Sequence, residues 1–265
     1  MKKVILAVLA VIAVCSLCLA GTVSAAKEGY GFSLFNGGDI TSWDGKVDPA
    51  TEWDDSFKDW LYDGWTQTTS FYRCKWGYSP AICENWLMEF LGDTTDDAGD
   101  WWEMSVDTSL AGGAAPQPEN FKVNWTTADG VKVWKGTGSG WTAFTEAVVG
   151  NGGDVFAGTS ISASPASATA HRIVEIYLDK GVSAGGPLAM ALDNNARLAI
   201  HDAATGKTVM WPPYSDANQP DTYGAGITDI SGGTIPEGLT IGVMVLLSTG
   251  AVIVSTRYFH KKPKI

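Results

Sequence analysis

Apolar positions fall into two kinds of segment along the chain. Predominantly apolar runs without charged residues stand near both ends, over residues 4–19 and 239–256. Between residues 27 and 231 the apolar positions come in short stretches separated by glycine, proline and small polar residues, and no long stretch has the spacing of an amphipathic helix. This pattern predicts an all-β body between two hydrophobic ends.

Short stretches rich in Val, Ile, Trp and Phe predict the strands of this body. We expect strands at residues 86–91, 102–106, 121–125, 131–134, 141–149, 173–178, 188–192 and 197–201. Asp129-Gly130 is a hairpin turn signal between the third and the fourth of these strands. The stretch 159–170, rich in Ser and Ala, is expected to be a loop. The length of the body suits one domain over residues 27–231.

The N-terminal run has the layout of a signal peptide. Lys2 and Lys3 precede the apolar run, and Val23-Ser24-Ala25 supplies the small residues that signal peptidase requires. We therefore expect export and removal of residues 1–25, with cleavage after Ala25 or Ala26. An uncleaved anchor is the alternative, but the run is short for a bilayer span.

The C-terminal run is typical of a membrane span. Residues 239–256 carry no charge, and the basic tail 257–265 follows them. Because basic residues stay on the cytoplasmic side, we expect a single-pass cell-membrane protein with its body outside and its C-terminus in the cytoplasm. A buried core helix is the alternative, and the absence of a polar face argues against it.

The stem before this span, residues 232–238, ends in Pro236, Glu237 and Gly238. A Pro-Glu-Gly motif, an apolar helix and a basic tail together resemble the sorting signals (PEF/PGF-type) of archaeosortase and exosortase substrates. The resemblance implies a sorting transpeptidase as a partner, which would remove the helix and pass the protein to a lipid. Proline and glycine are also ordinary residues at the boundary of a span, so a permanent anchor is the alternative.

The charge argues against nucleic acid as a partner. The net charge is −11, and basic residues gather at the two ends, so the body is more acidic than the whole chain. Such a field repels nucleic acid and anionic lipid, and it favours cations.

Cys74 and Cys83 lie in the body, which after export would be in a compartment where disulfides persist. Gly77 and Pro80 between them suit a closed turn. We expect a disulfide, which in the entropy model would stabilise the fold by roughly 2–3 kcal/mol. A zinc site is the alternative, but it needs two further Cys or His ligands and none lies nearby.

Six segments spread over the body carry a family resemblance. They are residues 43–49 with Glu52 and Trp53, residues 86–93, 100–104, 171–178, 211–213 and 220–224. Together they resemble the group that includes family 9 carbohydrate-binding modules and the DOMON domains. The resemblance implies an antiparallel, jelly-roll-like β-sandwich, and it implies function less directly because a sandwich hosts many functions.

Four carboxylates stand in one segment between two predicted strands: Asp93, Asp96, Asp97 and Asp100. Oxygen ligands at irregular spacing suit Ca²⁺, so this segment is a candidate calcium site. The alternative is a solvated acidic turn, in which Asp and Gly serve the backbone geometry.

Twelve tryptophans make aromatic recognition of a ligand a second candidate chemistry. Those beside predicted loops, together with one tyrosine, are the candidate ligand-binding residues Trp101, Trp102, Trp141, Trp211 and Tyr214. Exposed rings can stack on the C–H faces of sugars. The alternative is packing in the core, and strand alternation places one of Trp101 and Trp102 inside and the other outside.

The chain offers little material for haem or catalysis. Some members of the resembled group bind haem, but Met88, Met104, Met190, His171 and His201 show no diagnostic spacing, so haem is not expected. Three histidines leave little for a triad or a zinc site, although two carboxylates such as Glu89 and Glu103 could face each other across strands.

Asn124 begins the sequon Asn124-Trp125-Thr126 and is a candidate for N-glycosylation, although a position within a strand is unfavourable. The sequence therefore predicts a non-catalytic cell-surface module that binds extracellular glycan. The alternatives are a structural surface-layer or adhesion component and a haem-dependent electron-transfer domain.

Overall fold

The computed structural model describes residues 26–229 apart from 41, 49, 79–81, 151–152, 181–187 and 189–192. The strands are β1 (Gly31–Phe35), β2 (Phe57–Asp63), β3 (Thr66–Gly77), β4 (Cys83–Phe90), β5 (Trp101–Asp107), β6 (Phe121–Thr126), β7 (Gly130–Gly136), β8 (Trp141–Ala143), β9 (Val155–Ser164), β10 (Ser167–Asp179), β11 (Asn194–Asp202), β12 (Lys207–Trp211) and β13 (Gly224–Asp229). A single 3-10 turn, η1 (Pro220–Thr222), is the helical element of the described residues. The all-β prediction is confirmed.

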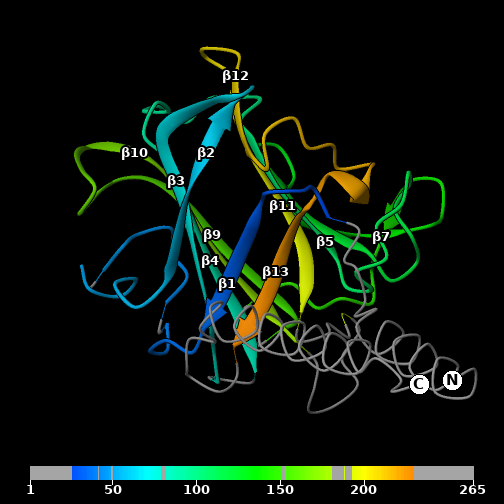
Figure 1. Ribbon diagram of the computed structural model, residues 1–265. Coiled ribbons are helices and arrows are strands. Elements are labelled where there is room, and N and C mark those ends of the chain that lie inside the picture. Colours follow the sequence, from blue (N-terminus) through cyan, green and yellow to red (C-terminus); the bar gives the residue numbers. More distant parts are fainter. Residues whose placement is uncertain are drawn as a thin grey trace, which may run out of the picture. The chain divides into compact units, whose positions relative to one another are not determined.

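The strands form one hydrogen-bonded path that curls back on itself (Figure 1). Its order is β8-β7-β6-β5-β11-β12-β2-β3-β4-β10-β9, while β13 pairs with β11 and with β1. The pairings along the path are antiparallel. The path therefore has two halves, β5–β8 with β11 on one side and β2–β4 with β9 and β10 on the other.

A large apolar core lies between these two halves. Strand β5 contributes Trp102 and Met104 to it, and β4 contributes Trp86 and Met88 from the facing half. These side chains alternate with outward-facing ones along each strand, as the period of two in a β-strand requires. The result is a β-sandwich, as expected.

A second, smaller core lies outside the first, on the other face of β4 and β10. Here Trp53, from the segment between β1 and β2, packs with Leu87 and Ile173. The Trp53 indole donates to Glu175 Oε1 at 3.1 Å, and the Gly45 amide donates to Glu175 Oε2 at 3.0 Å. Strand β4 is therefore buried on both faces.

Most of the expected strands are present, with some errors at the ends of segments. The strands expected at 86–91, 102–106, 121–125, 131–134, 173–178 and 197–201 correspond to β4, β5, β6, β7, β10 and β11. The strand expected at 141–149 is wrong beyond Ala143, where β8 ends. Of the strand expected at 188–192, only Leu188 is described, and it lies in a turn.

The predicted hairpin at Asp129-Gly130 is confirmed. Strands β6 and β7 pair antiparallel, with Thr126 opposite Gly130. Gly130 has φ +69°, a left-handed conformation that glycine adopts without the steric penalty of a side chain.

The loop expected at 159–170 is wrong. This stretch forms most of β9 and the beginning of β10, joined by a tight turn at Pro165 and Ala166. The two strands pair over a long antiparallel register. Small side chains are tolerated in these strands because hydrogen bonds between the main chains of β9 and β10 stabilise the pair. Ser160 Oγ also donates a 2.6 Å hydrogen bond to the Gly45 carbonyl. Composition alone is a weak guide where such pairing decides the conformation.

The expected disulfide is also wrong, because Cys74 and Cys83 are not bonded to each other. In the β3–β4 pairing Cys74 lies opposite Trp86, whereas Cys83 lies opposite Gly77. The two residues are thus three positions apart along the ladder, roughly 10 Å at the rise of a strand. An odd offset also puts them on opposite faces, Cys74 in the large core and Cys83 outside it. Neither separation nor direction suits a disulfide.

Candidate functional site

The half of the sandwich that contains β5–β8 and β11 presents an outer face with aromatic and charged side chains. Alternate residues of these strands enter the core, so the residues between them point outward. We name this outward set the aromatic face: Trp101, Glu103, Lys122, Asn124, Trp134, Trp141, Arg197 and His201.

Alternation separates the two adjacent tryptophans at the start of β5, as predicted. Trp102 is 1% exposed and belongs to the large core. Trp101 lies on the aromatic face and stacks on His201 of β11, with ring centroids 5.3 Å apart and an interplanar angle of 15°. Its cross-strand position opposite His201 produces this stack.

Two further rings surround the ammonium group of Lys122. Its Nζ lies 5.8 Å from the ring centroid of Trp134 and 5.3 Å from that of Trp141. The Trp134 indole donates to Asn124 Oδ1 at 2.6 Å. The buried Trp141 Nε1 has no hydrogen-bond partner among the described residues. Lys122 is therefore held between two rings, and the enclosed Trp141 indole N–H is left without a partner among the described residues.

Charged groups connect these rings. Glu103 lies between Lys122, whose Nζ is 3.8 Å away, and Arg197, which pairs with it closely. Burial lowers the pKa of Lys122, an effect that Glu103 opposes and Arg197 increases. Arg197 Nε also donates to the Ser215 carbonyl at 3.1 Å, in the loop that follows β12. Between its tryptophans, the aromatic face thus carries one anionic acceptor, Glu103, and two cationic donors, Lys122 and Arg197.

The loop after β12 and the turn between β2 and β3 together form a second, separate aromatic pair. Tyr214 is 58% exposed, and its ring centroid lies 5.1 Å from that of Trp65, which is 64% exposed. Lys27 Nζ lies 4.8 Å from the Trp65 centroid. By contrast, Trp211 is fully buried in the large core and donates to Asp59 Oδ2 at 3.0 Å.

The five candidate aromatic residues are therefore divided among three places. Trp101 and Trp141 lie on the aromatic face, and Tyr214 is exposed elsewhere, whereas Trp102 and Trp211 are core residues and wrong as surface candidates. Sequence reasoning missed Trp134 and Trp65, and it considered His201 only as a haem ligand. The Asp63-Gly64 turn signal next to Trp65 could have identified its exposed position.

A buried arginine occupies the expected calcium site. The Arg172 guanidinium donates to Asp93 at 3.0 Å, to Asp96 at 2.9 Å and to Asp100 at 2.6 Å. The acidic segment is therefore ordered by a side chain from β10. Burial raises the pKa of Asp93, an effect that Arg172 opposes. Sequence reasoning missed Arg172 because it lies more than seventy residues away along the chain.

Asp97 does not bond to Arg172 but groups with Asp100 and Asp202, with one carboxylate oxygen of each within 4.8 Å of the others. These carboxylates accept protein donors, including Ala203 N on Asp100 and Ala204 N on Asp202. Calcium binding stays a prediction.

Other candidate residues serve packing or pair with protein groups. Met88 and Met104 are buried in the large core, and His171 bonds to Glu89 at 2.8 Å. Glu89 and Glu103 point away from the core in different halves of the sandwich, so the idea that they face each other is wrong. Met190 lies outside the described residues.

Asn124 lies within β6 on the aromatic face, where its Oδ1 accepts a hydrogen bond from the Trp134 indole N–H. Its glycosylation stays a prediction.

The predictions for the two ends concern residues outside the described part of the chain. These are the signal peptide at 1–25, the motif Pro236, Glu237 and Gly238, the span at 239–256 and the tail at 257–265. Among the described residues there is no helix long and apolar enough to cross a membrane.

The sequence matches no family model and no curated protein. Two similar solved structures are family 9 carbohydrate-binding modules from Caldicellulosiruptor kristjanssonii, one in complex with glucose and one with cellotriose. The glucose complex is 12% identical with a TM-score of 0.52, and the match covers 78% of this chain and 100% of that chain. For the cellotriose complex the identity is 12%, the TM-score 0.49 and the coverage 78% and 98%. The likeness to the glucose complex shows a sandwich fold of the kind found in that module, as the sequence resemblance implied.

Proposed function

We propose that this chain is a non-catalytic module that binds an extracellular oligosaccharide on the aromatic face. The observation that carries the proposal is the arrangement of Trp134 and Trp141 around Lys122, with Glu103 beside them. Sugars present apolar C–H faces to rings and hydroxyl groups to polar side chains, so a site for them needs both kinds of group close together. The aromatic face supplies both.

The strand register gives the face a length suited to several sugar units. Trp134 lies opposite Lys122 on β6, while Trp101 lies opposite Thr126 on the same strand. The two tryptophans are therefore separated by about 13 Å along the strands and by two strand spacings, about 10 Å, across them. Glu103 and Asn124 lie opposite each other between them. This layout favours an oligosaccharide over a single sugar.

Charged groups on the face are suited to hydroxyl recognition. Trp141 offers its ring to a sugar, whereas its Nε1 is enclosed by the protein. Glu103 can accept, and Lys122 can donate. The groups lie on strands, which hold side chains more firmly than loops do. We place the module at the cell surface, which depends on the predicted signal peptide and membrane span.

The test is glycan-array binding of the full-length protein, produced in a host without N-glycosylation so that Asn124 stays unmodified. Glucose and cello-oligosaccharides are the first ligands to titrate, because the similar solved modules hold glucose and cellotriose. We expect Trp134→Ala and Trp141→Ala each to weaken binding at least tenfold. Trp65→Ala is the matched control, since it removes an exposed tryptophan outside the aromatic face.

Two outcomes would contradict the proposal. Loss of binding in Trp65→Ala alone would move the site to the Trp65–Tyr214 pair. A folded protein that binds no glycan would favour the structural surface-layer role instead, and a coloured preparation would favour the haem-binding role.

A further inference from the structure

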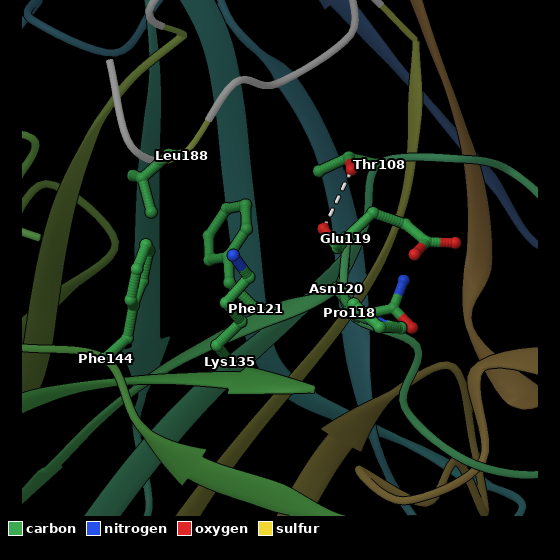
Figure 2. A pocket seen from close by; sticks show the side chains of 8 residues that line it. All are labelled: Thr108, Pro118, Glu119, Asn120, Phe121, Lys135, Phe144 and Leu188. Atoms are coloured by element: carbon green, nitrogen blue, oxygen red, sulfur yellow. Dashed lines mark hydrogen bonds between the residues drawn. The ribbon is translucent and has the colours of Figure 1, made fainter. Parts of the chain in front are cut away.

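A cavity separate from the aromatic face lies over the outer face of β2, β3 and β4. It is a cavity of about 240 Å³, and none of the residues that line it belongs to the strands of the aromatic face. The segment between β1 and β2 and the turn between β9 and β10 form its walls. A smaller cavity of about 120 Å³, around Phe121, Lys135 and Phe144, is shown in Figure 2. The larger one combines apolar and charged groups in a way that points to a ligand.

The base of this cavity is apolar and aromatic. Phe71, Trp53 and Leu87 line it, and each is almost completely buried. Trp60 lies edge-on to Phe71, with the centroids 6.3 Å apart. These side chains give the cavity a closed apolar base beneath its charged groups.

Two cations line the cavity side by side. Lys58 of β2 lies directly opposite Arg73 of β3. Lys58 Nζ is 3.8 Å from the ring centroid of Phe71, and Arg73 Cζ is 5.8 Å from the same centroid. Among the described residues neither cation forms an ion pair within 4.0 Å.

Such a pair is unusual in a chain with an excess of acidic residues. Like charges placed opposite each other on two strands destabilise the sheet, and a bound anion would relieve the repulsion. Burial lowers the pKa of Lys58 and Arg73 lowers it further, against the opposing effect of Glu89. Arg73 is held in place by its bond to the Trp53 carbonyl at 2.5 Å.

A carboxylate lines another part of the cavity. Glu89 is buried, and its Oε2 accepts from His171 Nε2 at 2.8 Å and from Ser164 Oγ at 2.5 Å. Burial works against protonation of His171, but the bond to Glu89, the bond to the Thr169 carbonyl and the negative charge of Glu89 together outweigh it and raise the pKa of His171. The histidine therefore balances part of the charge of Glu89, while the carboxylate can still accept a hydroxyl group. Asp54, also on the lining, is exposed.

We propose that this cavity binds one anionic sugar, either a hexuronic acid or a sulfated hexose. Its charged group would lie between Lys58 and Arg73, and a hydroxyl group would donate to Glu89, with the apolar base of the cavity beneath the ring. Guanidinium and ammonium groups bind carboxylate and sulfate oxygens through charge-assisted hydrogen bonds. The volume suits a single ring, in contrast to the long aromatic face. The proposal does not depend on the proposed function of that face.

The test is isothermal titration of the full-length protein with D-glucuronate, D-glucose 6-sulfate and D-glucose. We expect at least one of the two anions to bind tenfold or more tightly than glucose, and to bind less tightly as salt increases. The preferred anion then identifies the source of the charge. Lys58→Gln and Arg73→Gln should each weaken anion binding at least tenfold.

Three control variants make the test specific. Lys132→Gln removes an exposed lysine of β7 and should leave anion binding unchanged. Trp141→Ala alters the aromatic face alone, so anion binding that survives this change separates the two proposals. Arg73→Lys keeps the charge and should bind better than Arg73→Gln if both variants stay folded by circular dichroism. Equal binding of glucose and both anions, absence of anion binding, or wild-type anion affinity in Lys58→Gln would overturn the proposal.

Discussion

Replacing Arg172 by methionine isolates the role of the buried guanidinium in the acidic segment. Arg172 is almost completely buried and donates to Asp93, Asp96 and Asp100. The side chains of Asp93 and Asp100 are themselves buried, whereas that of Asp96 is exposed. Methionine keeps much of the aliphatic volume but removes the charge. Two carboxylates would then remain buried without their cation.

The expected loss follows from this burial. Removing one partner of a buried ion pair typically destabilises a protein by about 3–5 kcal/mol. The exposed pair with Asp96 adds at most about 1 kcal/mol. The total loss is therefore about 3–6 kcal/mol, and because each kcal/mol lowers the Tm of a domain of this size by about 2–4 °C, the variant should melt roughly 6–24 °C below the wild type.

The assay is thermal and urea unfolding followed by circular dichroism, with Lys132→Met as the matched control. The ion pair of Lys132 with Asp129 is exposed, so its loss should change stability by less than about 1 kcal/mol. Because burial already raises the pKa of Asp93, loss of Arg172 should raise it further, and the deficit should shrink at low pH as Asp93 becomes protonated. An Arg172→Met loss no larger than that of Lys132→Met would refute this reasoning.

Three further predictions concern the two cores. Trp102→Ala should destabilise the fold by about 3–5 kcal/mol, whereas Trp101→Ala should lose little beyond its stack, about 0.5–1.5 kcal/mol; similar losses in urea unfolding would show that the alternation is misassigned. Burial raises the pKa of Glu175 from 4.5 to about 8, so its contribution to stability is fully present below pH 4.5 and is lost as the pH rises through about 8. Glu175→Gln should flatten the dependence of the free energy of unfolding on pH in this range. An unchanged slope would contradict the raised pKa of Glu175. Alkylation in denaturant without reductant should label Cys74, and a peptide in which Cys74 and Cys83 are cross-linked would contradict the observed register.

The sequence by itself determined the local features of the fold. Strand alternation predicted that only one of Trp101 and Trp102 enters the core, because neighbouring side chains of a strand point to opposite faces. The Asp129-Gly130 signal predicted the β6–β7 hairpin because the required backbone conformation is set by two residues. The apolar stretches likewise predicted the central part of β4, β5 and β10.

Only the tertiary structure decided which distant residues meet. Arg172 enters the acidic segment because β10 lies beside β4, and Cys74 stays apart from Cys83 because the β3–β4 register offsets them. The serine-rich stretch became β9 because a partner strand satisfies its backbone groups, which its composition does not reveal. Pairing register and layer packing are long-range properties, and a local pattern carries no information on which strand will be its neighbour.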